Sequence, residues 1–274
     1  MRIVTTIAGS DSGGGAGIQA DLKTFQELDV FGTSVITALT AQNTLGVSGV
    51  LPIEVSFVEK QFLALLEDFP ISAIKTGMLF SSAIIQKVAS SIAGLEIPLI
   101  VDPVMIAKGG ENLLQQEAVE ALRTHLLPLA TVLTPNIPEA EVLTGRKIEH
   151  VTDIKQTAET LLQLGVYCVV IKGGHLTDEK YATDYVFFKD GRTFTMQAKR
   201  INTKNTHGTG CTFSAALTAF IAQGFPLDHA IIEAKKFIQM AITHDLGIGN
   251  GHGPTNHFAY QQHKDACEVT VLET

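Results

Sequence analysis

Short apolar runs alternate with segments of helical periodicity along most of this chain. Runs of apolar and β-branched residues are typical of strands, and apolar residues that recur every three or four positions are typical of helices. Strands are predicted at residues 3–7, 35–38, 73–76, 99–102, 131–134 and 168–171. Helices are predicted after Gly17 and at residues 55–66, 82–92, 117–126, 156–164, 209–223 and 227–244.

This alternation predicts an α/β fold with a central, mostly parallel sheet and helices on both faces. The runs at residues 98–101 and 168–171 are apolar throughout, as expected for strands buried on both faces. Ligands bind such sheets in the crevice at the carboxyl ends of the strands. We therefore expect functional residues directly after strands.

Residues 184–195 depart from the alternation. Two β-rich runs flank Asp190-Gly191, and Asp-Gly between such runs is a strong hairpin signal, so we predict a small antiparallel edge. Residues 247–254 contain four glycines and predict no regular structure. Because no composition break or internal repeat divides the chain, we expect residues 1–274 to form one domain.

Charge and composition narrow the classes of partner. The net charge is -8, no Lys/Arg-rich block occurs and there is no tryptophan, so a nucleic-acid partner is not expected. No apolar stretch reaches the roughly 18 residues of a membrane span, and the N-terminus lacks a signal-peptide pattern. Three cysteines without metal-site spacing suit a reducing compartment. We expect a cytoplasmic protein without a membrane or zinc partner.

The segment from His207 to Thr212 opens a predicted helix and contains Gly208 and Gly210. Glycines let backbone N–H groups converge on an anion at a helix N-terminus, which predicts a phosphate site; an ordinary helix cap is the alternative. Cys211 lies within this turn, where the N–H groups and the helix dipole are expected to lower the pKa of its thiol and favour a thiolate base. A small buried residue that allows close helix packing is the other interpretation.

A second glycine-rich segment, residues 8–17, follows the first predicted strand. It lacks the Gly-x-Gly-x-x-Gly spacing, and the chain has no Gly-Lys-Ser/Thr P-loop, so both common nucleotide templates fail. The segment suits either close approach of the backbone to a flat small ligand or tight packing of helix on strand. Asp21 is expected one turn into the following helix, facing this loop.

Polar side chains stand at the ends of several predicted strands. Asp102 is placed where a carboxylate would meet a metal–phosphate complex, with a turn cap as the alternative. Gln42 offers both a donor and an acceptor to the edge of a heterocycle, or is a solvated loop residue. Asn136 and Glu139 either point toward one ion and its water shell or cap the next helix.

Basic side chains near glycines are further candidates. Lys172 ends a predicted strand beside two glycines, a place for a positive charge near nucleotide phosphates, although surface lysines are common. His175 and His207 either lie near a nucleotide or are polar loop residues.

Taken together, these segments closely resemble, in order and over nearly the whole chain, the hydroxymethylpyrimidine kinase/phosphomethylpyrimidine kinase family of thiamine synthesis, within the ribokinase-like superfamily. The motifs that carry the resemblance are residues 8–21, 41–44, 75–78, 102–105, 134–136, 172–175 and 206–212. The resemblance implies a ribokinase-like fold and ATP-dependent phosphorylation of 4-amino-5-hydroxymethyl-2-methylpyrimidine, then of its monophosphate. It also implies Mg²⁺ and a homodimer, and leaves a monovalent-cation requirement open.

The resemblance also implies roles by position. The pyrimidine would be held by Gly9, Asp21, Gln42, Met78 and Val104. An anion hole would be formed by Gly208, Thr209, Gly210 and Cys211, with Cys211 where most ribokinase-like enzymes have an aspartate base. ATP would be bound by Asn136, Lys172, Thr203 and His207, and magnesium by Asp102 and Glu139.

Two other functions are alternatives to this one. Pyridoxal kinases of the cysteine-containing subgroup also phosphorylate a hydroxymethyl group on a nitrogen heterocycle, and resemblance to them predicts a second cysteine after residues 102–105. Residues 106–110 hold no cysteine, which favours the pyrimidine. A binding protein without activity would have a damaged anion hole, whereas Gly208 and Gly210 are present. Residues 106–112 contain two glycines and form either a closing lid or a solvated turn.

Overall fold

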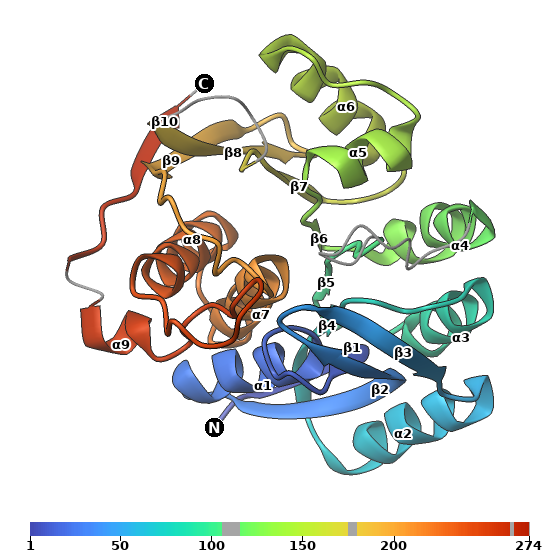
Figure 1. The fold of residues 1–274 in the computed structure, drawn as a ribbon. Helices are drawn as coiled ribbons and strands as arrows, with labels where there is room; N and C mark the ends of the chain where they lie inside the picture. The colour runs from blue at the N-terminus through green and yellow to red at the C-terminus, as the bar shows by residue number, and fades with distance from the viewer. Residues whose placement is uncertain (106–115, 175–179, 264–265, 274) are drawn as a thin grey trace.

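The structure is a computed structural model, and it describes residues 1–105, 116–174, 180–263 and 266–273. Within these residues one sheet of ten strands runs through the molecule in the order β10-β9-β8-β7-β6-β5-β4-β1-β2-β3 (Figure 1). The strands are β1 Ile3–Asp11, β2 Phe31–Asn43, β3 Gly46–Pro52, β4 Ile71–Thr76, β5 Leu99–Val101, β6 Val132–Leu133, β7 Cys168–Lys172, β8 Tyr181–Phe188, β9 Thr193–Lys199 and β10 Thr270–Glu273.

The centre of the sheet is parallel and both flanks are antiparallel. Strands β2, β1, β4, β5, β6 and β7 pair in parallel, as predicted. The hairpin predicted at residues 184–195 is confirmed as β8–β9, and β8 also pairs antiparallel with β7. Strands β3 and β10 were not predicted. Both are almost wholly exposed, and β3 contains glycines and ends in proline, so neither carries the apolar pattern of a buried strand.

Helices cover both faces of the sheet (Figure 1). Apolar residues of α2 to α6 pack on one face, and those of α1, α7, α8 and α9 pack on the other. The helices are α1 Gly17–Glu27, α2 Val55–Asp68, α3 Ser82–Ile92, α4 Gln116–Ala121, α5 Ile137–Thr144, α6 Val151–Gln163, α7 Thr209–Ala222, α8 Leu227–Thr243 and α9 Ala259–His263. The helix predicted at 117–126 is α4 continued by a π-helical turn, Leu122–Leu126, ahead of Pro128.

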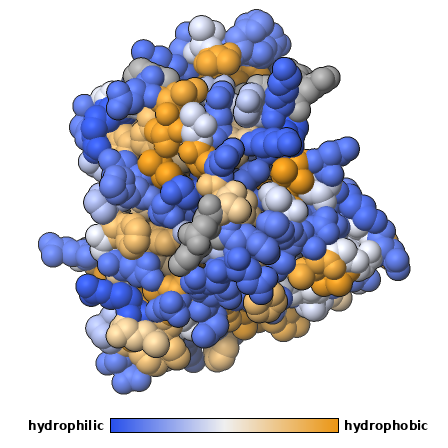
Figure 2. Space-filling view, turned by 90° about the vertical axis from the view of Figure 1, so that its left-hand side faces the viewer, coloured by the Kyte–Doolittle hydropathy of each residue, from blue (hydrophilic) through white to orange (hydrophobic). Residues whose placement is uncertain are grey.

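The side of the molecule that carries α8, α9 and β10 is mostly hydrophilic, with separate apolar areas (Figure 2). This is expected for helices that bury an apolar stripe against a sheet and expose their polar face to solvent. Among the helices described, none is long and apolar enough to cross a membrane.

The sheet topology brings distant segments to one edge. Parallel pairing aligns the carboxyl ends of β1, β4, β5, β6 and β7, so the loops that follow these strands lie near one another. The N-terminus of α7 reaches the same edge, which is where ligands bind in open α/β sheets.

Candidate active site

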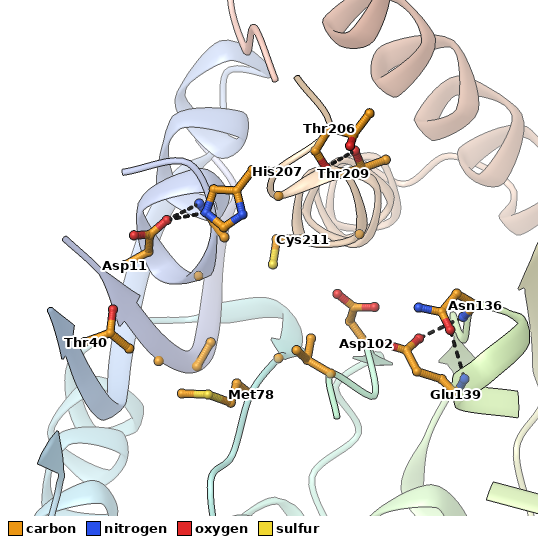
Figure 3. Close-up of a pocket in the computed structure, with 18 of the residues that line it drawn as sticks. Asp11, Thr40, Met78, Asp102, Asn136, Glu139, Thr206, His207, Thr209 and Cys211 are labelled. Carbon is orange, nitrogen blue, oxygen red and sulfur yellow. Dashed lines mark hydrogen bonds and ion pairs between the residues drawn. The ribbon is translucent and has the colours of Figure 1, made fainter. Parts of the chain in front are cut away.

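A cavity of about 610 Å³ lies at the carboxyl ends of the parallel strands (Figure 3). Its walls come from the loops after the parallel strands, from β2 and β3, and from the first turn of α7. The predicted site residues that line it are Gly9, Gln42, Met78, Val104, Asp102, Asn136, Glu139, Lys172, His207, Gly208, Thr209, Gly210 and Cys211. Asp21 and Thr203 do not line it.

The first turn of α7 is built on Gly208, whose φ is +80°. A side chain at Gly208 would collide with the carbonyl oxygen of Gly15, so the two glycine-rich loops touch backbone to backbone. Thr209 opens the helix, and its hydroxyl donates to the carbonyl of Thr206 at 2.7 Å. The first N–H groups of a helix have no carbonyl partner within it, which leaves those of α7 available to an anion in the cavity.

Cys211 follows in the same turn, and its sulfur points into the cavity (Figure 3). Burial raises the pKa of this thiol to about 11. Lys75 lowers that pKa, whereas the nearby carboxylates of Asp21 and Asp102 raise it further. The predicted lowering of the thiol pKa is therefore wrong, because burial and the two carboxylates outweigh Lys75 and a backbone hydrogen bond from Gly17. Cys211 is protonated at neutral pH.

A buried ion pair supports the floor of the cavity. Lys75 donates to both carboxylate oxygens of Asp21, at 3.0 and 2.8 Å, and the Thr6 hydroxyl donates to the same carboxylate at 2.6 Å. Both charged side chains are 0% exposed. Burial alone would lower the pKa of Lys75, but the charge of Asp21 raises it overall and keeps the lysine protonated. Asp21 thus lies behind Lys75, and its placement does not favour the predicted contact with a ligand.

Asp102 follows β5, the strand next to that of Lys75, and one of its carboxylate oxygens lacks a hydrogen bond. Its Oδ1 accepts from Lys172 Nζ at 3.0 Å and from the Thr134 hydroxyl at 3.3 Å. Its Oδ2 is buried and has no hydrogen-bond partner within the described part of the chain. A buried carboxylate oxygen without a donor suits a cation that arrives with a ligand.

Asn136 and Glu139 form a capping box at the start of α5, so the capping interpretation of this pair is correct. The Asn136 side chain accepts from Glu139 N at 2.9 Å, and Glu139 Oε2 accepts from Asn136 N at 2.8 Å. Glu139 also lines the cavity, which leaves room for a second role. Burial raises its pKa to about 7; Lys172 opposes this shift and Asp102 adds to it.

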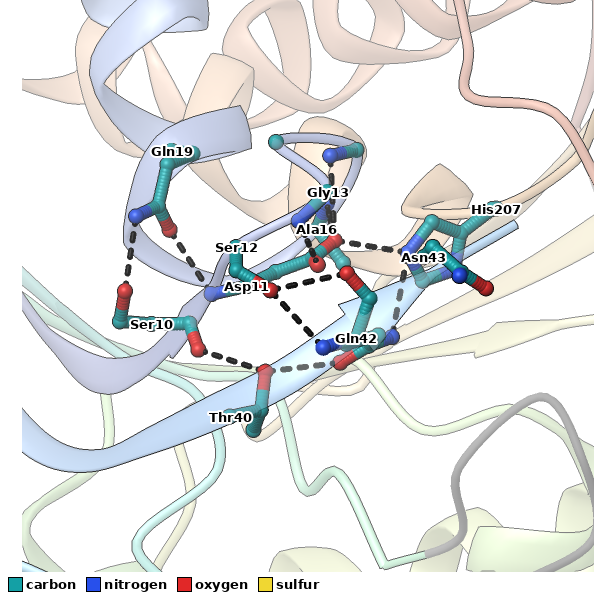
Figure 4. A network of polar contacts seen from close by, with 12 residues as sticks. Ser10, Asp11, Ser12, Gly13, Ala16, Gln19, Thr40, Gln42, Asn43 and His207 are labelled. Atoms are coloured by element: carbon teal, nitrogen blue, oxygen red, sulfur yellow. Dashed lines mark hydrogen bonds and ion pairs between the residues drawn. The ribbon is translucent and has the colours of Figure 1, made fainter. Parts of the chain in front are cut away.

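Asp11, which was not predicted as a site residue, links the two glycine-rich loops (Figure 4). Its Oδ2 accepts from His207 Nε2 at 2.8 Å and from the N–H groups of Gly15 and Ala16 at 3.0 and 2.8 Å. Its Oδ1 accepts from Gly13 N at 2.8 Å. An aspartate two residues before a glycine run is a signal for such a turn.

Because an ionised carboxylate only accepts hydrogen bonds, Nε2 of His207 carries the proton in this pair. Burial alone would raise the pKa of Asp11, but the hydrogen bond and charge of His207, with the loop N–H groups, lower it overall. The ring of His207 is thus turned toward Asp11. Gln42 Nε2 also lies 3.4 Å from the same ring nitrogen, and Thr40 donates to Gln42 Oε1 at 3.1 Å.

Asp11→Asn is expected to make stability less dependent on pH in the acid range. A carboxylate with a lowered pKa stabilises the fold above its ordinary pKa of 3.8, and this contribution is lost as pH falls through the lowered value. Between pH 6 and pH 3 the free energy of unfolding, measured with urea, should therefore fall less in Asp11→Asn than in the wild type. Glu159→Gln, on the exposed face of α6, should follow the wild type; equal slopes for Asp11→Asn and the wild type would contradict this assignment.

Other predicted residues lie elsewhere or outside the described part. The Thr203 hydroxyl donates to Asp245 at 3.1 Å, away from the cavity, and Thr206 lines the cavity instead. The predicted lid at 106–112 and the predicted site of His175 lie outside the described residues. Residues of the wall that were not predicted include Asp11, Thr40 and Val47.

Comparison with known proteins identifies a family that this chain matches. The family model for phosphomethylpyrimidine kinase matches residues 11–256. A hydroxymethylpyrimidine/phosphomethylpyrimidine kinase of Haemophilus influenzae is 56% identical over 265 residues, 96% of this chain and 98% of that protein.

Solved structures agree with this match. The pyridoxal kinase of Staphylococcus aureus in complex with AMP-PCP and pyridoxal has a TM-score of 0.91 at 36% identity, covering 100% of this chain and 99% of that one. The phosphomethylpyrimidine kinase of Clostridium difficile has a TM-score of 0.78 at 45% identity, covering 88% and 100%. These likenesses confirm the predicted ribokinase-like α/β fold, and the chain belongs to the phosphomethylpyrimidine kinase family.

Proposed function

We propose that this protein is an ATP-dependent kinase that phosphorylates 4-amino-5-hydroxymethyl-2-methylpyrimidine and then its monophosphate, giving the diphosphate. The observation that carries the proposal is a convergence at the start of α7. A Cβ added at Gly210 would lie 3.3 Å from Lys172 Nζ and 3.4 Å from Asp102 Oδ2. Helix N–H groups, a lysine and a carboxylate with a free oxygen are thus within reach of one phosphoryl group.

The other end of the cavity suits a flat heterocycle. Gly9 leaves space for the methyl group of Met78, which a Cβ at position 9 would strike. Val104 and Val47 add apolar walls, and the amide of Gln42, whose Oε1 accepts from the Thr40 hydroxyl, is the polar group that would read the pyrimidine edge.

In this proposal the residues divide the work of phosphoryl transfer. The N–H groups of the α7 turn stabilise negative charge on the transferred phosphoryl group, and Lys172 and Asn136 hold the ATP phosphates. His207 positions the turn through Asp11. Cys211 accepts the hydroxyl proton in its thiolate form, which is a small fraction at neutral pH for a thiol of pKa about 11 and grows as pH rises.

Magnesium fits the same corner. Mg²⁺ is usually bound through one or two carboxylates together with substrate phosphates rather than by a protein cage. No cage of three or more candidate ligands occurs within the residues described, whereas the free Oδ2 of Asp102, with Glu139 beside it, supplies the two carboxylates. When bound there, Mg²⁺ would neutralise charge on the ATP phosphates.

Asp102→Asn is accordingly expected to raise the Mg²⁺ concentration for half-maximal activity by about tenfold or more, because an amide is a weaker ligand than a carboxylate. Titration of activity with MgCl₂ at saturating ATP checks this, with Glu159→Gln as the exposed control. An unchanged Mg²⁺ requirement would remove Asp102 from the metal site. Repeating the assay with K⁺ replaced by a tetraalkylammonium ion tests the open monovalent-cation requirement.

A second candidate is pyridoxal kinase activity, favoured by the close structural likeness to the Staphylococcus aureus pyridoxal kinase. The experiment that separates the two is a substrate panel with MgATP, in which ADP is measured for the pyrimidine alcohol, its monophosphate, pyridoxine and pyridoxal. We expect turnover of both pyrimidines and a kcat/KM for the vitamin B6 compounds lower by about tenfold or more. No ADP with any compound would instead indicate a protein that only binds.

We also propose that a second copy of this chain is its protein partner. Leu39 of β2 and Leu51 of the edge strand β3 are cross-strand neighbours, and both are exposed. Exposed leucines at an open sheet edge mark a surface that a partner can cover. Leu51→Lys should therefore shift the sedimenting species from dimer to monomer; a wild-type protein that sediments as a monomer would exclude the dimer.

The single sheet also supports one domain over residues 1–274, and the three free cysteines support a cytoplasmic location.

A further inference from the structure

A buried ion pair lies behind the nucleotide half of the cavity, and nothing described so far uses it. Lys235 of α8 donates to Asp184 Oδ2 of β8 at 2.7 Å, with side chains only 6% and 7% exposed. Neither residue lines the cavity. Lys235 is therefore buried rather than part of the outer surface of α8.

The second oxygen of Asp184 reaches the cavity wall through the backbone. Oδ1 accepts the N–H of Gly173 at 3.0 Å. Gly173 directly follows Lys172, the last residue of β7, and the β7–β8 register places Lys172 opposite Asp184. Gly174, the next residue, lines the cavity. Asp184 therefore fixes the point at which the chain leaves the sheet and turns along the site.

The stability of the fold does not by itself explain the charges of Asp184 and Lys235. Met196 lies across from Asp184 on β9, and it belongs with Val186 and Phe237 to one buried apolar cluster. An ion pair in such a setting is often no more stabilising than an apolar pair of the same size. An ionised carboxylate, however, accepts a stronger hydrogen bond from a backbone N–H than a neutral group does. Lys235 holds Oδ2 of this carboxylate, and Oδ1 is directed at the N–H of Gly173.

The position of this turn affects Lys172, because Lys172 is the residue directly before Gly173. Lys172 Nζ lies 3.0 Å from Asp102 and beside the first turn of α7, so its reach depends on where β7 ends. We propose that Asp184 and Lys235 are positioning residues that preorganise the Lys172-Gly173-Gly174 turn for the phosphates of ATP. This inference rests on the proposed kinase function, in which the turn faces the nucleotide.

Two double variants separate positioning from mere stability. Asp184→Asn with Lys235→Met removes both charges but keeps an acceptor for Gly173 N–H, whereas Asp184→Leu with Lys235→Met removes the charges and the acceptor. Leucine, asparagine and aspartate have similar shapes, so the comparison isolates one hydrogen bond. We expect the KM for ATP to be about tenfold higher in the leucine pair than in the asparagine pair, as for loss of one hydrogen bond to a buried group. The KM for the pyrimidine should change less than twofold in both.

Equal KM values for ATP in the two pairs, or a parallel rise in the KM for the pyrimidine, would overturn the proposal. Amide hydrogen exchange on the wild-type protein without substrates gives an independent test that needs no variant to fold. The Gly173 amide should exchange as slowly as the amides of β7, and exchange at the rate of an open loop would also overturn it. This measurement needs no activity, so fast exchange at Gly173 would count against the positioning role alone. Failure of the proposed kinase function would appear instead as a wild-type protein that makes no ADP.

Discussion

Cys211→Ala is expected to lower kcat for the pyrimidine alcohol by about hundredfold, while the KM for ATP changes less than twofold. A side chain that takes a proton in the transition state contributes roughly 10² to 10⁴ in rate. Cys211 lies in the α7 turn with its sulfur in the cavity, and truncation leaves the N–H groups of that turn in place. Steady-state kinetics with each substrate varied in turn measure both constants.

Cys267→Ala is the matched control, because this partly buried thiol contacts the carbonyl of Lys236 far from the cavity. Its kcat should equal that of the wild type. A Cys211→Ala enzyme within threefold of wild-type kcat would remove the cysteine from proton transfer and leave the N–H groups and charged residues as the whole of the catalytic apparatus.

The raised thiol pKa gives the same prediction a pH signature. Below a pKa of about 11 the thiolate fraction rises tenfold for each pH unit, so kcat should rise between pH 7 and pH 9 when proton transfer limits the rate. Cys211→Ala should lose this rise. A wild-type kcat that is flat over this range, at saturating substrates and with chemistry rate-limiting, would contradict the thiolate as base.

Asp21→Asn is expected to lower the free energy of unfolding by about 3–5 kcal/mol, since it leaves the charge of Lys75 buried without its partner. Urea unfolding measures the loss. The double variant Asp21→Leu with Lys75→Met carries no buried charge and should be more stable than Asp21→Asn.

The same variant also decides the role of Asp21. If Asp21 contacted the pyrimidine, Asp21→Asn would raise the KM for the pyrimidine while the free energy of unfolding stayed near that of the wild type. The burial of Asp21 under Lys75 favours the opposite result, a large loss of stability.

Much of the site could be predicted because the sheet is parallel. The rule that ligands bind at carboxyl strand ends identified Asp102, Asn136 and Lys172, and all three line one cavity. The rule needs only the positions of apolar runs, which are strong here. It could not find β3 or β10, because exposed strands lack that apolar pattern.

The electrostatics of the site could not be predicted in the same way. The position of Cys211 in a helix turn predicts a lowered thiol pKa, but burial and the charges of Asp21 and Asp102 raise it. The balance depends on how deeply each group lies and on charges brought in from other strands. The pairing of Asp11 with His207 likewise depends on how two loops pack, which neither segment reveals alone.

That pairing has a consequence for synthesis of the chain. Asp11 and His207 are 196 residues apart in the sequence, and Cys211 comes shortly after His207. At a synthesis rate of about 5–20 residues per second, the first loop leaves the ribosome roughly 10–40 s before its partner exists. The nascent protein can therefore complete much of its parallel sheet while Asp11 still lacks its partner, and the α7 wall of the cavity is added only in the last quarter of its translation.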